Sequence, residues 1–319
     1  MIRKVIKYLF THGIIKTFQK VIFKIKNIIK RKQIRKYLYK YIDEQIIKLL
    51  NMKYVLSYLK KRYYPNLGFS CNPLIMLKKP VIWVCWFQGI ENAPDIVKTC
   101  FNSIKEHSSC FDIILITENN IKNYVNFPDY IYDKLNKGII SKTHFTDLLR
   151  LNLLISYGGI WLDATVFLSK NIPDFIINSD LFFFKCSNVE DGSFLPGSSW
   201  FISSKKNNPL LVKMYNILLK YWEKENKLMH YYLFHISLLL VIKNDNEANE
   251  LWNEIYYMNN SNPHALQFML FDNYNKDKLE HVFNLSFAHK LSYYFSDNDK
   301  ELFAKDGTFY KYIIEELEK

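Results

Sequence analysis

Hydrophobic residues recur at steps of three and four positions along the first 40 residues of the chain. The series begins at Ile2, Val5, Ile6 and Leu9 and continues to Ile29. This spacing matches the period of a helix with one apolar face. The opposite face carries basic residues, including Lys4, Lys7, Lys16, Lys20, Lys24, Arg31 and Lys32. We therefore predict a basic amphipathic helix at the N-terminus.

The 41–79 segment predicts a further helix followed by a linker, because Pro65, Gly68 and Pro73 interrupt its second half. At Val81 the pattern changes to the short apolar run VIWVCWF, which is typical of a buried strand. We place a domain boundary there, with a basic helical segment and linker at 1–79 and the main domain at 80–319.

A strand, a helix and a second strand follow one another at the start of the main domain. Pro94 opens a helical stretch that runs to about His107, and the apolar run FDIILIT at 111–117 comes next. This order predicts a parallel α/β sheet. Because ligands bind beyond the carboxyl ends of such strands, candidate ligand-binding residues lie at the end of each strand: Phe87 and Gln88, then Thr117, Glu118 and Asn119.

Residues 141–157 predict a helix that Ser141 caps and that the pair Gly158 and Gly159 ends. The run WLDATVFL at 161–168 predicts the next strand, interrupted at its centre by Asp163 and Thr165. A carboxylate inside an apolar run is costly unless it has partners or a function.

The rest of the chain predicts two more strands and then mostly helices. The strands are expected at 181–185 and 198–204, the helices at 208–222, 229–243, 247–258, 263–272 and 309–317, and an irregular or extended segment at 284–295.

Composition and charge narrow the class of protein. The chain has 319 residues, of which 49% are hydrophobic, so it can bury a large core. Its five cysteines form no C-x-x-C pair, which favours neither a disulfide framework nor a zinc knuckle and fits a reducing cytoplasm.

The positive charge is concentrated at the N-terminus. Residues 1–79 hold 20 Lys and Arg against 2 Asp and Glu, whereas the remainder carries a net charge of −6. Such a helix suits an anionic membrane surface, and the alternative is packing of its apolar face on the main domain. Lysines interrupt every apolar run, so neither a transmembrane helix nor a secretory signal is predicted. We expect a cytoplasmic protein, peripheral on the inner face of the cell membrane.

Asp147 and Arg150 share one face of the predicted helix and combine a carboxylate with a guanidinium. A carboxylate accepts hydrogen bonds from sugar hydroxyls, and a guanidinium donates a fork of bonds to phosphate or carboxylate oxygens. The alternative for this pair is a structural salt bridge.

The stretch SKTHFTDLLRLNLLISYGGIWLDATVFL resembles the glycosyltransferases that have a sugar-binding region containing a DXD motif, and especially the capsular polysaccharide synthesis subgroup. The segments VIWVCWFQG and ITENN upstream, and SSWFIS, YYLFH and HKLSYY downstream, follow in the order of that family. The resemblance runs from about residue 80 to the C-terminus. It implies a GT-A-type, Rossmann-like domain with additional helices.

The resemblance also implies roles for individual residues. Asp147, Arg150 and Asp163 take the catalytic positions, and Asp163 is the first acid of the motif. Thr165 stands where the second acid would be, and a neutral hydroxyl is a weaker ligand for a hard cation. A site with Mn²⁺ or Mg²⁺ held by Asp163, Thr165 and His289 and a metal-free site balanced by lysine or histidine both remain open. Lys290 is the expected phosphate partner.

Aromatic residues complete the expected donor site. Trp83, Phe87 and Gln88 are candidates for a base slot, and Trp161 and Trp200 for further donor contacts. The alternative for Trp83 is a place in the core. For His230, His235, Tyr231 and Tyr232, helix packing is preferred over lining an acceptor site.

The expected function is transfer of a sugar from a nucleotide-sugar donor, expected to be a UDP-sugar, to a lipid-linked or oligosaccharide acceptor in capsular or surface polysaccharide assembly. The resemblance implies retention of anomeric configuration. One alternative is a toxin-like protein glycosyltransferase. The other is a nucleic-acid-binding protein that uses the basic N-terminus, and the regular apolar stripe argues against nucleic acid as a partner.

Overall fold

The computed structural model describes residues 51–64, 68–186, 195–303 and 305–315. The chain divides into two units, Met1–Tyr54 and Val55–Lys319. The amphipathic helix predicted for residues 1–40 lies outside the described residues. Among the helices that are described, none is both long enough and apolar enough to cross a bilayer.

A five-stranded mixed sheet forms the centre of the second unit. Its strands are β1 (Val81–Cys85), β2 (Asp112–Ile116), β3 (Gly159–Asp163), β5 (Leu181–Lys185) and β6 (Gly197–Ser204), in the order β2-β1-β3-β6-β5. β1 is parallel to β2 and β3, whereas β6 is antiparallel to both of its neighbours. The predicted α/β class is confirmed.

The carboxyl ends of the three parallel strands lie level with one another. Cys85 at the end of β1 pairs with Ile116 on one side and with Asp163 on the other. The loops after β1 and β2 and the break after β3 therefore come together at one edge of the sheet.

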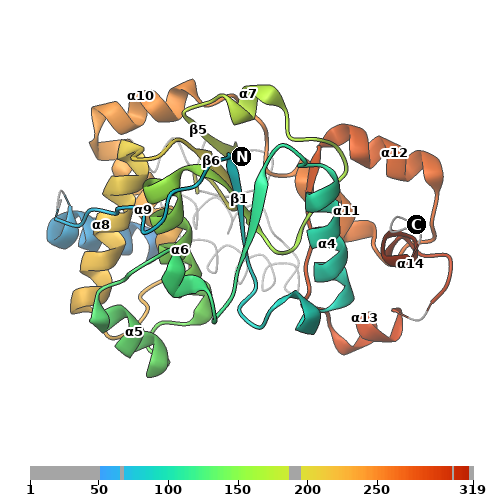
Figure 1. The fold of residues 1–319 in the computed structure, drawn as a ribbon, viewed down its shortest axis with the longest axis horizontal. Coiled ribbons are helices and arrows are strands. Elements are labelled where there is room, and N and C mark those ends of the chain that lie inside the picture. The colour runs from blue at the N-terminus through green and yellow to red at the C-terminus, as the bar shows by residue number, and fades with distance from the viewer. Residues whose placement is uncertain (1–50, 65–67, 187–194, 304, 316–319) are drawn as a thin grey trace, which may run out of the picture. The chain divides into compact units, whose positions relative to one another are not determined.

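Two groups of helices lie on opposite sides of this sheet (Figure 1). One group holds α5 (Asp129–Asn136), α6 (Lys142–Tyr157), α8 (Pro209–Lys224), α9 (Leu233–Asn244) and α10 (Asn246–Glu254). The other holds α4 (Asp95–Glu106), α11 (Ala265–Met269), α12 (Lys276–Leu285), α13 (Asp297–Glu301) and α14 (Phe309–Glu315). The short elements are α7 (Asp174–Ile177) and the 3-10 turns η1 (Ile90–Asn92), η2 (Ile121–Asn123) and η3 (Asn262–His264).

A second, two-stranded sheet joins the break after β3 to the C-terminal part of the chain. β4 (Val166–Leu168) pairs antiparallel with β7 (Ala288–Lys290), so that Val166 lies opposite Lys290. The backbone N–H of Leu291 also donates to the carbonyl of Thr165 at 2.9 Å. The predicted interruption at Asp163 and Thr165 is thus the point where the chain leaves one sheet for another.

Residues 55–64 and 68–79 pack on the α/β unit, whereas the sequence assigned them to a helical segment and linker outside it. Described residues are helical over 51–63. The hydroxyls of Tyr58 and Tyr63 both donate to Glu225 Oε1, and the backbone N–H groups of Gly68 and Phe69 donate to Asn216 Oδ1 at 2.8 Å. These contacts fix the segment against the middle and the C-terminal end of α8.

Candidate active site

Helix α6 carries two of the predicted site residues and is fixed at both ends. Ser141 Oγ accepts a hydrogen bond from the backbone N–H of His144 at the N-terminus. Gly158 ends the helix with φ of 72° and Gly159 follows with φ of 93°, a region that favours glycine. Both helix boundaries match the prediction.

The glycine pair also brings β3 against β1. A Cβ on Gly159 would lie 2.3 Å from the carbonyl oxygen of Val81. The indole N–H of Trp83 donates to the Gly158 carbonyl at 3.0 Å from inside the core. These contacts fix the C-terminal end of α6 against β1. They therefore also fix the position of Arg150 on α6 relative to Asp163 on β3.

Arg150 is the hub of the site, and only 4% of its surface is exposed. Its Nη1 lies 3.3 Å from Asp147 Oδ1 and donates to the Ser199 carbonyl at 2.9 Å. Its Nη2 lies 3.4 Å from Asp163 Oδ1. The guanidinium carbon stands 5.1 Å from the ring centroid of Trp161, a position that favours a cation–π contact. The three predicted catalytic residues therefore converge in space.

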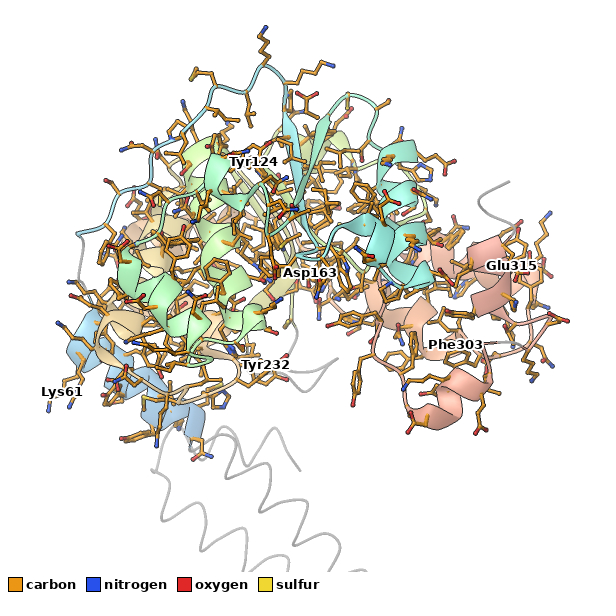
Figure 2. The ribbon with its side chains drawn as sticks, turned by 60° about the horizontal axis from the view of Figure 1, so that its bottom comes forward. Lys61, Tyr124, Asp163, Tyr232, Phe303 and Glu315 are labelled. Atoms are coloured by element: carbon orange, nitrogen blue, oxygen red, sulfur yellow. The ribbon has the colours of Figure 1, made fainter. Side chains whose placement is uncertain are left out.

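Asp163, labelled in Figure 2, lies at the end of β3. Because 27% of its side chain is exposed, a ligand can reach it. Its Oδ1 accepts a hydrogen bond from the indole N–H of Trp161 at 3.0 Å. Its Oδ2 faces the Lys290 ammonium at 3.7 Å, and that ammonium also donates to Thr165 Oγ1. The carboxylate is thus held between a guanidinium and an ammonium.

Burial changes the acid–base properties of two side chains near Arg150. It raises the pKa of Asp147 to about 6, against the opposing attraction of Arg150. It lowers the pKa of His235 to about 3, and the positive charge of Arg150 acts in the same direction. His235 is therefore a neutral imidazole at pH 7. Its Nδ1 is buried without a hydrogen-bond partner among the described residues.

The loops after β1 and β2 meet the start of α6 at the carboxyl edge of the sheet. The Lys142 ammonium lies 2.7 Å from Glu118 Oε1 and 5.5 Å from the ring centroid of Phe87. The Phe87 carbonyl accepts from the backbone N–H of Glu118. Gln88 and Asn119 are exposed and Thr117 is half-buried on the same two loops. These donor candidates share one edge, as predicted.

Two tryptophans that were predicted to contact the donor, Trp83 and Trp200, lie away from the carboxyl edge. Trp83 is fully buried between Tyr124 and Tyr157, as the core alternative predicted. Trp200 is 5% exposed and its indole N–H donates to Asn260 Oδ1. Neither tryptophan offers a ring face to a base.

His289 is not brought together with Asp163. It has no exposed surface, its Nε2 lies 2.9 Å from Ser169 Oγ, and its ring packs against Phe283. Successive strand residues point to opposite faces, so the register that directs Lys290 to Asp163 turns His289 away.

The side-chain oxygens around Asp163 are already engaged by protein groups, which disfavours the divalent cation that the sequence left open beside a metal-free site. Ca²⁺ and Mg²⁺ take about six or more oxygen ligands. Here Asp163 Oδ1 already contacts the Arg150 guanidinium and accepts from the Trp161 indole. Asp163 Oδ2 faces the Lys290 ammonium, and Thr165 Oγ1 accepts from that same ammonium. Across the part of the chain that the structure describes, no group of three or more His, Cys, Asp or Glu side chains is placed to hold a metal.

Several side chains near the site were missed or expected only to pack. Trp86 follows β1 directly, is half-buried, and meets Tyr293 edge to face with ring centroids 5.1 Å apart. Tyr231 and Tyr232, at the start of α9, are 65% and 44% exposed. Trp86 stands near the carboxyl end of the predicted strand run VIWVCWF, and that position was the signal that could have identified it.

The chain matches the sequence profile of a known family over nearly its whole length. The family described as "Capsular polysaccharide synthesis protein" covers residues 15–313. Among curated proteins, the chain is 27% identical to O-glycosyltransferase braB of Annulohypoxylon truncatum over 183 residues, which is 50% of this chain and 42% of that protein. It is 23% identical to glycosyltransferase afumC of Aspergillus fumigatus over 45% of this chain and 38% of that protein. The matched part thus spans about two fifths of each relative.

Solved structures of glycosyltransferases also resemble the chain. The PaToxG glycosyltransferase is matched with a TM-score of 0.36 and 16% identity, over 87% of this chain and 97% of that one. The apo form of glycosyltransferase GlyE from Streptococcus pneumoniae TIGR4 is matched with a TM-score of 0.35 and 12% identity, over 76% and 63% of the two chains.

Proposed function

The chain belongs to the capsular polysaccharide synthesis protein family, and from this premise we propose that it is a glycosyltransferase that uses a nucleotide-sugar donor. The two curated relatives are named glycosyltransferases, which supports the proposal. The acceptor we propose is a glycan, lipid-linked or free, in the assembly of a capsular or other surface polysaccharide.

One observation carries this proposal: Arg150 joins Asp147 and Asp163, and Asp163 in turn faces Lys290. These four side chains come from α6, β3 and β7. Carboxylates that accept from sugar hydroxyls stand beside cations that attract phosphate oxygens. A sugar diphosphate requires both kinds of group within one site.

The proposed reaction needs little covalent chemistry from the protein. The acceptor oxygen bonds to the anomeric carbon while the bond from that carbon to the β-phosphate oxygen breaks. The electron pair leaves with the nucleoside diphosphate, and the proton of the acceptor hydroxyl passes to a departing phosphate oxygen. Fixed positive charge beside that phosphate lowers the barrier. Same-face attack of this kind retains the anomeric configuration, as the resemblance implies.

The carboxyl edge supports binding of the donor's nucleoside. Phe87 and Trp86 offer aromatic surface there, and Glu118 and Lys142 offer polar groups. Aromatic rings stack on bases with about 1 to 3 kcal/mol per base in nucleic-acid complexes. We propose a UDP-sugar as the donor.

The start of α9 supports a saccharide acceptor. The rings of Tyr231 and Tyr232 lie 5.2 Å apart and are exposed, and Tyr232 contacts His235, whose pKa responds to both Arg150 and Asp163. Tyrosine combines a flat apolar face with a hydroxyl. An aromatic surface of this kind suits the apolar face of a sugar ring.

The proposed function is tested by a thermal-shift and donor-hydrolysis screen across UDP-, GDP-, CDP- and ADP-sugars. We expect one UDP-sugar to raise the melting temperature of the wild type and to be hydrolysed slowly. Asp163→Ala should lose both effects, because Arg150 and Lys290 are no longer held in place. Asp180→Ala is the matched control. Within the described part of the chain, the Asp180 carboxylate forms an ion pair only with Lys205, and both side chains are exposed at the surface.

The proposal fails if no sugar nucleotide stabilises the wild type. It also fails if a folded Asp163→Ala protein turns over donor at the wild-type rate. Circular dichroism of both variants establishes that they fold.

A further inference from the structure

The Lys290 ammonium contacts Thr165, the residue that stands where the family motif has its second acid. β7 pairs with β4 so that Lys290 lies opposite Val166, one residue beyond Thr165. Its ammonium reaches back to Thr165 Oγ1 and faces Asp163 Oδ2 at 3.7 Å. The two motif positions, Asp163 and Thr165, therefore both face one ammonium group.

The Lys290 side chain is held in one place and keeps donor capacity. An ammonium has three hydrogens to donate. One bonds Thr165 Oγ1 and another is within 3.2 Å of the Leu291 carbonyl. The third faces Asp163 Oδ2 at a distance too long for a good hydrogen bond. The side chain is 21% exposed, so a phosphate oxygen can approach this third hydrogen.

Thr165 suits an ammonium better than it suits a metal. A hydroxyl oxygen accepts well from an ammonium, while a carboxylate at the same position would add a second negative charge and attract a divalent cation. The threonine in place of the second acid is therefore compatible with the Lys290 ammonium, which β7 brings beside it.

We propose that Lys290 supplies the positive charge that a divalent metal ion supplies in metal-dependent glycosyltransferases. The chain would then bind the donor's diphosphate, and release it as the leaving group, without a metal. This inference rests on the proposed function, because it assigns the diphosphate of the same donor. Asp163 and Thr165 orient the ammonium, and the ammonium contacts the β-phosphate. As the bond to the anomeric carbon breaks, the fixed positive charge faces the oxygen that receives the electron pair.

Calorimetric binding of UDP, GDP, CDP and ADP to the full chain tests this inference. Each titration is made in EDTA and again with Mn²⁺, at about 0.3 M salt, where surface charges are screened over a few ångströms. We expect one nucleotide to bind the wild type in EDTA with an affinity that Mn²⁺ changes less than twofold. Lys290→Met should weaken that binding at least tenfold, and Lys290→Arg should restore part of it.

Lys170→Met is the matched control. Lys170 lies two residues after β4, at the surface, where its ammonium bonds Asn284 Oδ1 at 2.8 Å. This variant should bind nucleotide as the wild type does. Thermal unfolding of each variant without nucleotide establishes that a loss of affinity is not a loss of fold.

The outcomes separate this inference from the proposed function. Binding that requires Mn²⁺, or a folded Lys290→Met protein that binds in EDTA like the wild type, overturns the role of Lys290 while the transferase proposal stands. Absence of binding by all four nucleotides under both conditions overturns the transferase proposal, and the role of Lys290 with it.

Discussion

At the scale of single residues, Asp147 is held in an environment that disfavours its charge. Only 12% of its side chain is exposed, and its carboxylate forms an ion pair with the Arg150 guanidinium at 3.3 Å. Burial outweighs that attraction and raises the pKa to about 6. Titratable groups whose pKa values are strongly shifted by burial and a charged partner cluster at functional sites. Asp147 is therefore expected to cost stability and to serve the ligand.

Asp147→Asn should raise stability and abolish donor turnover. With a folded-state pKa near 6 against 3.8 unfolded, the folded protein binds more protons between these values. Its free energy of unfolding therefore falls as pH rises from about 4 to about 6. Asparagine does not titrate, so the variant should gain about 3 kcal/mol relative to the wild type at pH 7.5. The gain should vanish near pH 4.

Urea unfolding of both proteins at pH 4 and pH 7.5 measures this difference. A variant that is no more stable than the wild type at pH 7.5, relative to pH 4, would contradict the assignment of a raised pKa. Nucleotide-sugar hydrolysis by the same preparations checks the loss of activity.

Residue chemistry and the family resemblance together predicted which side chains gather at the candidate site, but only in part. Asp147, Arg150, Asp163 and Lys290 were all predicted and the structure brings them together. For His289 the sequence could not help, because one step of strand register separates the face of Lys290 from the opposite face.

At the scale of elements, the turn from α6 to β3 sets the geometry of the site. Gly158 and Gly159 both have positive φ, and each would bring a Cβ within 3 Å of another backbone. The turn is tight because β3 enters the sheet beside β1 without an intervening loop. The turn therefore sets the position of Asp163, which lies at the other end of β3.

Gly159→Ala should destabilise the protein by about 3 kcal/mol or more. The added methyl meets the Val81 carbonyl oxygen and Cγ1 at 2.3 and 2.7 Å, and the φ of 93° is strained for alanine. Gly138→Ala is the matched control, since it has a φ of 69° but open space around its Cβ. We expect a cost of about 1 kcal/mol there.

Chemical denaturation of the two variants checks this prediction. Equal costs at Gly159 and Gly138 would show that the contact with Val81 can relax, and would remove the argument that the turn fixes Asp163.

At the scale of the whole molecule, charge is separated along the chain. Residues 1–79 hold 20 Lys and Arg against 2 Asp and Glu, while the remainder is acidic. Basic residues near an anionic bilayer contribute about 1 kcal/mol each. We propose an anionic membrane surface as the partner of this segment. A lipid-linked acceptor would then lie on the same surface as the enzyme.

The full chain should bind phosphatidylcholine vesicles that contain phosphatidylserine, and the affinity should fall as salt rises. Changing Lys4, Lys7, Lys16, Lys20 and Lys24 to glutamine should weaken vesicle binding at least tenfold and leave donor hydrolysis unchanged. Sedimentation with vesicles measures the first effect. Tighter binding to duplex DNA than to these vesicles at equal salt would instead favour a nucleic-acid partner.

The sequence by itself determined the α/β class, the strands around the site, and both ends of α6, because these depend on local periodicity, caps and glycines. It also determined that acids and a guanidinium gather near Asp163, through the fixed spacing of one helix, one turn and one strand. Only the tertiary structure decided which residues lie opposite one another across distant segments. The pairing of β4 with β7 directs Lys290 to Asp163 and buries His289, and the packing of the sheet places Trp83 in the core and leaves Tyr232 exposed. Such pairings join residues more than a hundred positions apart, and no local pattern records them.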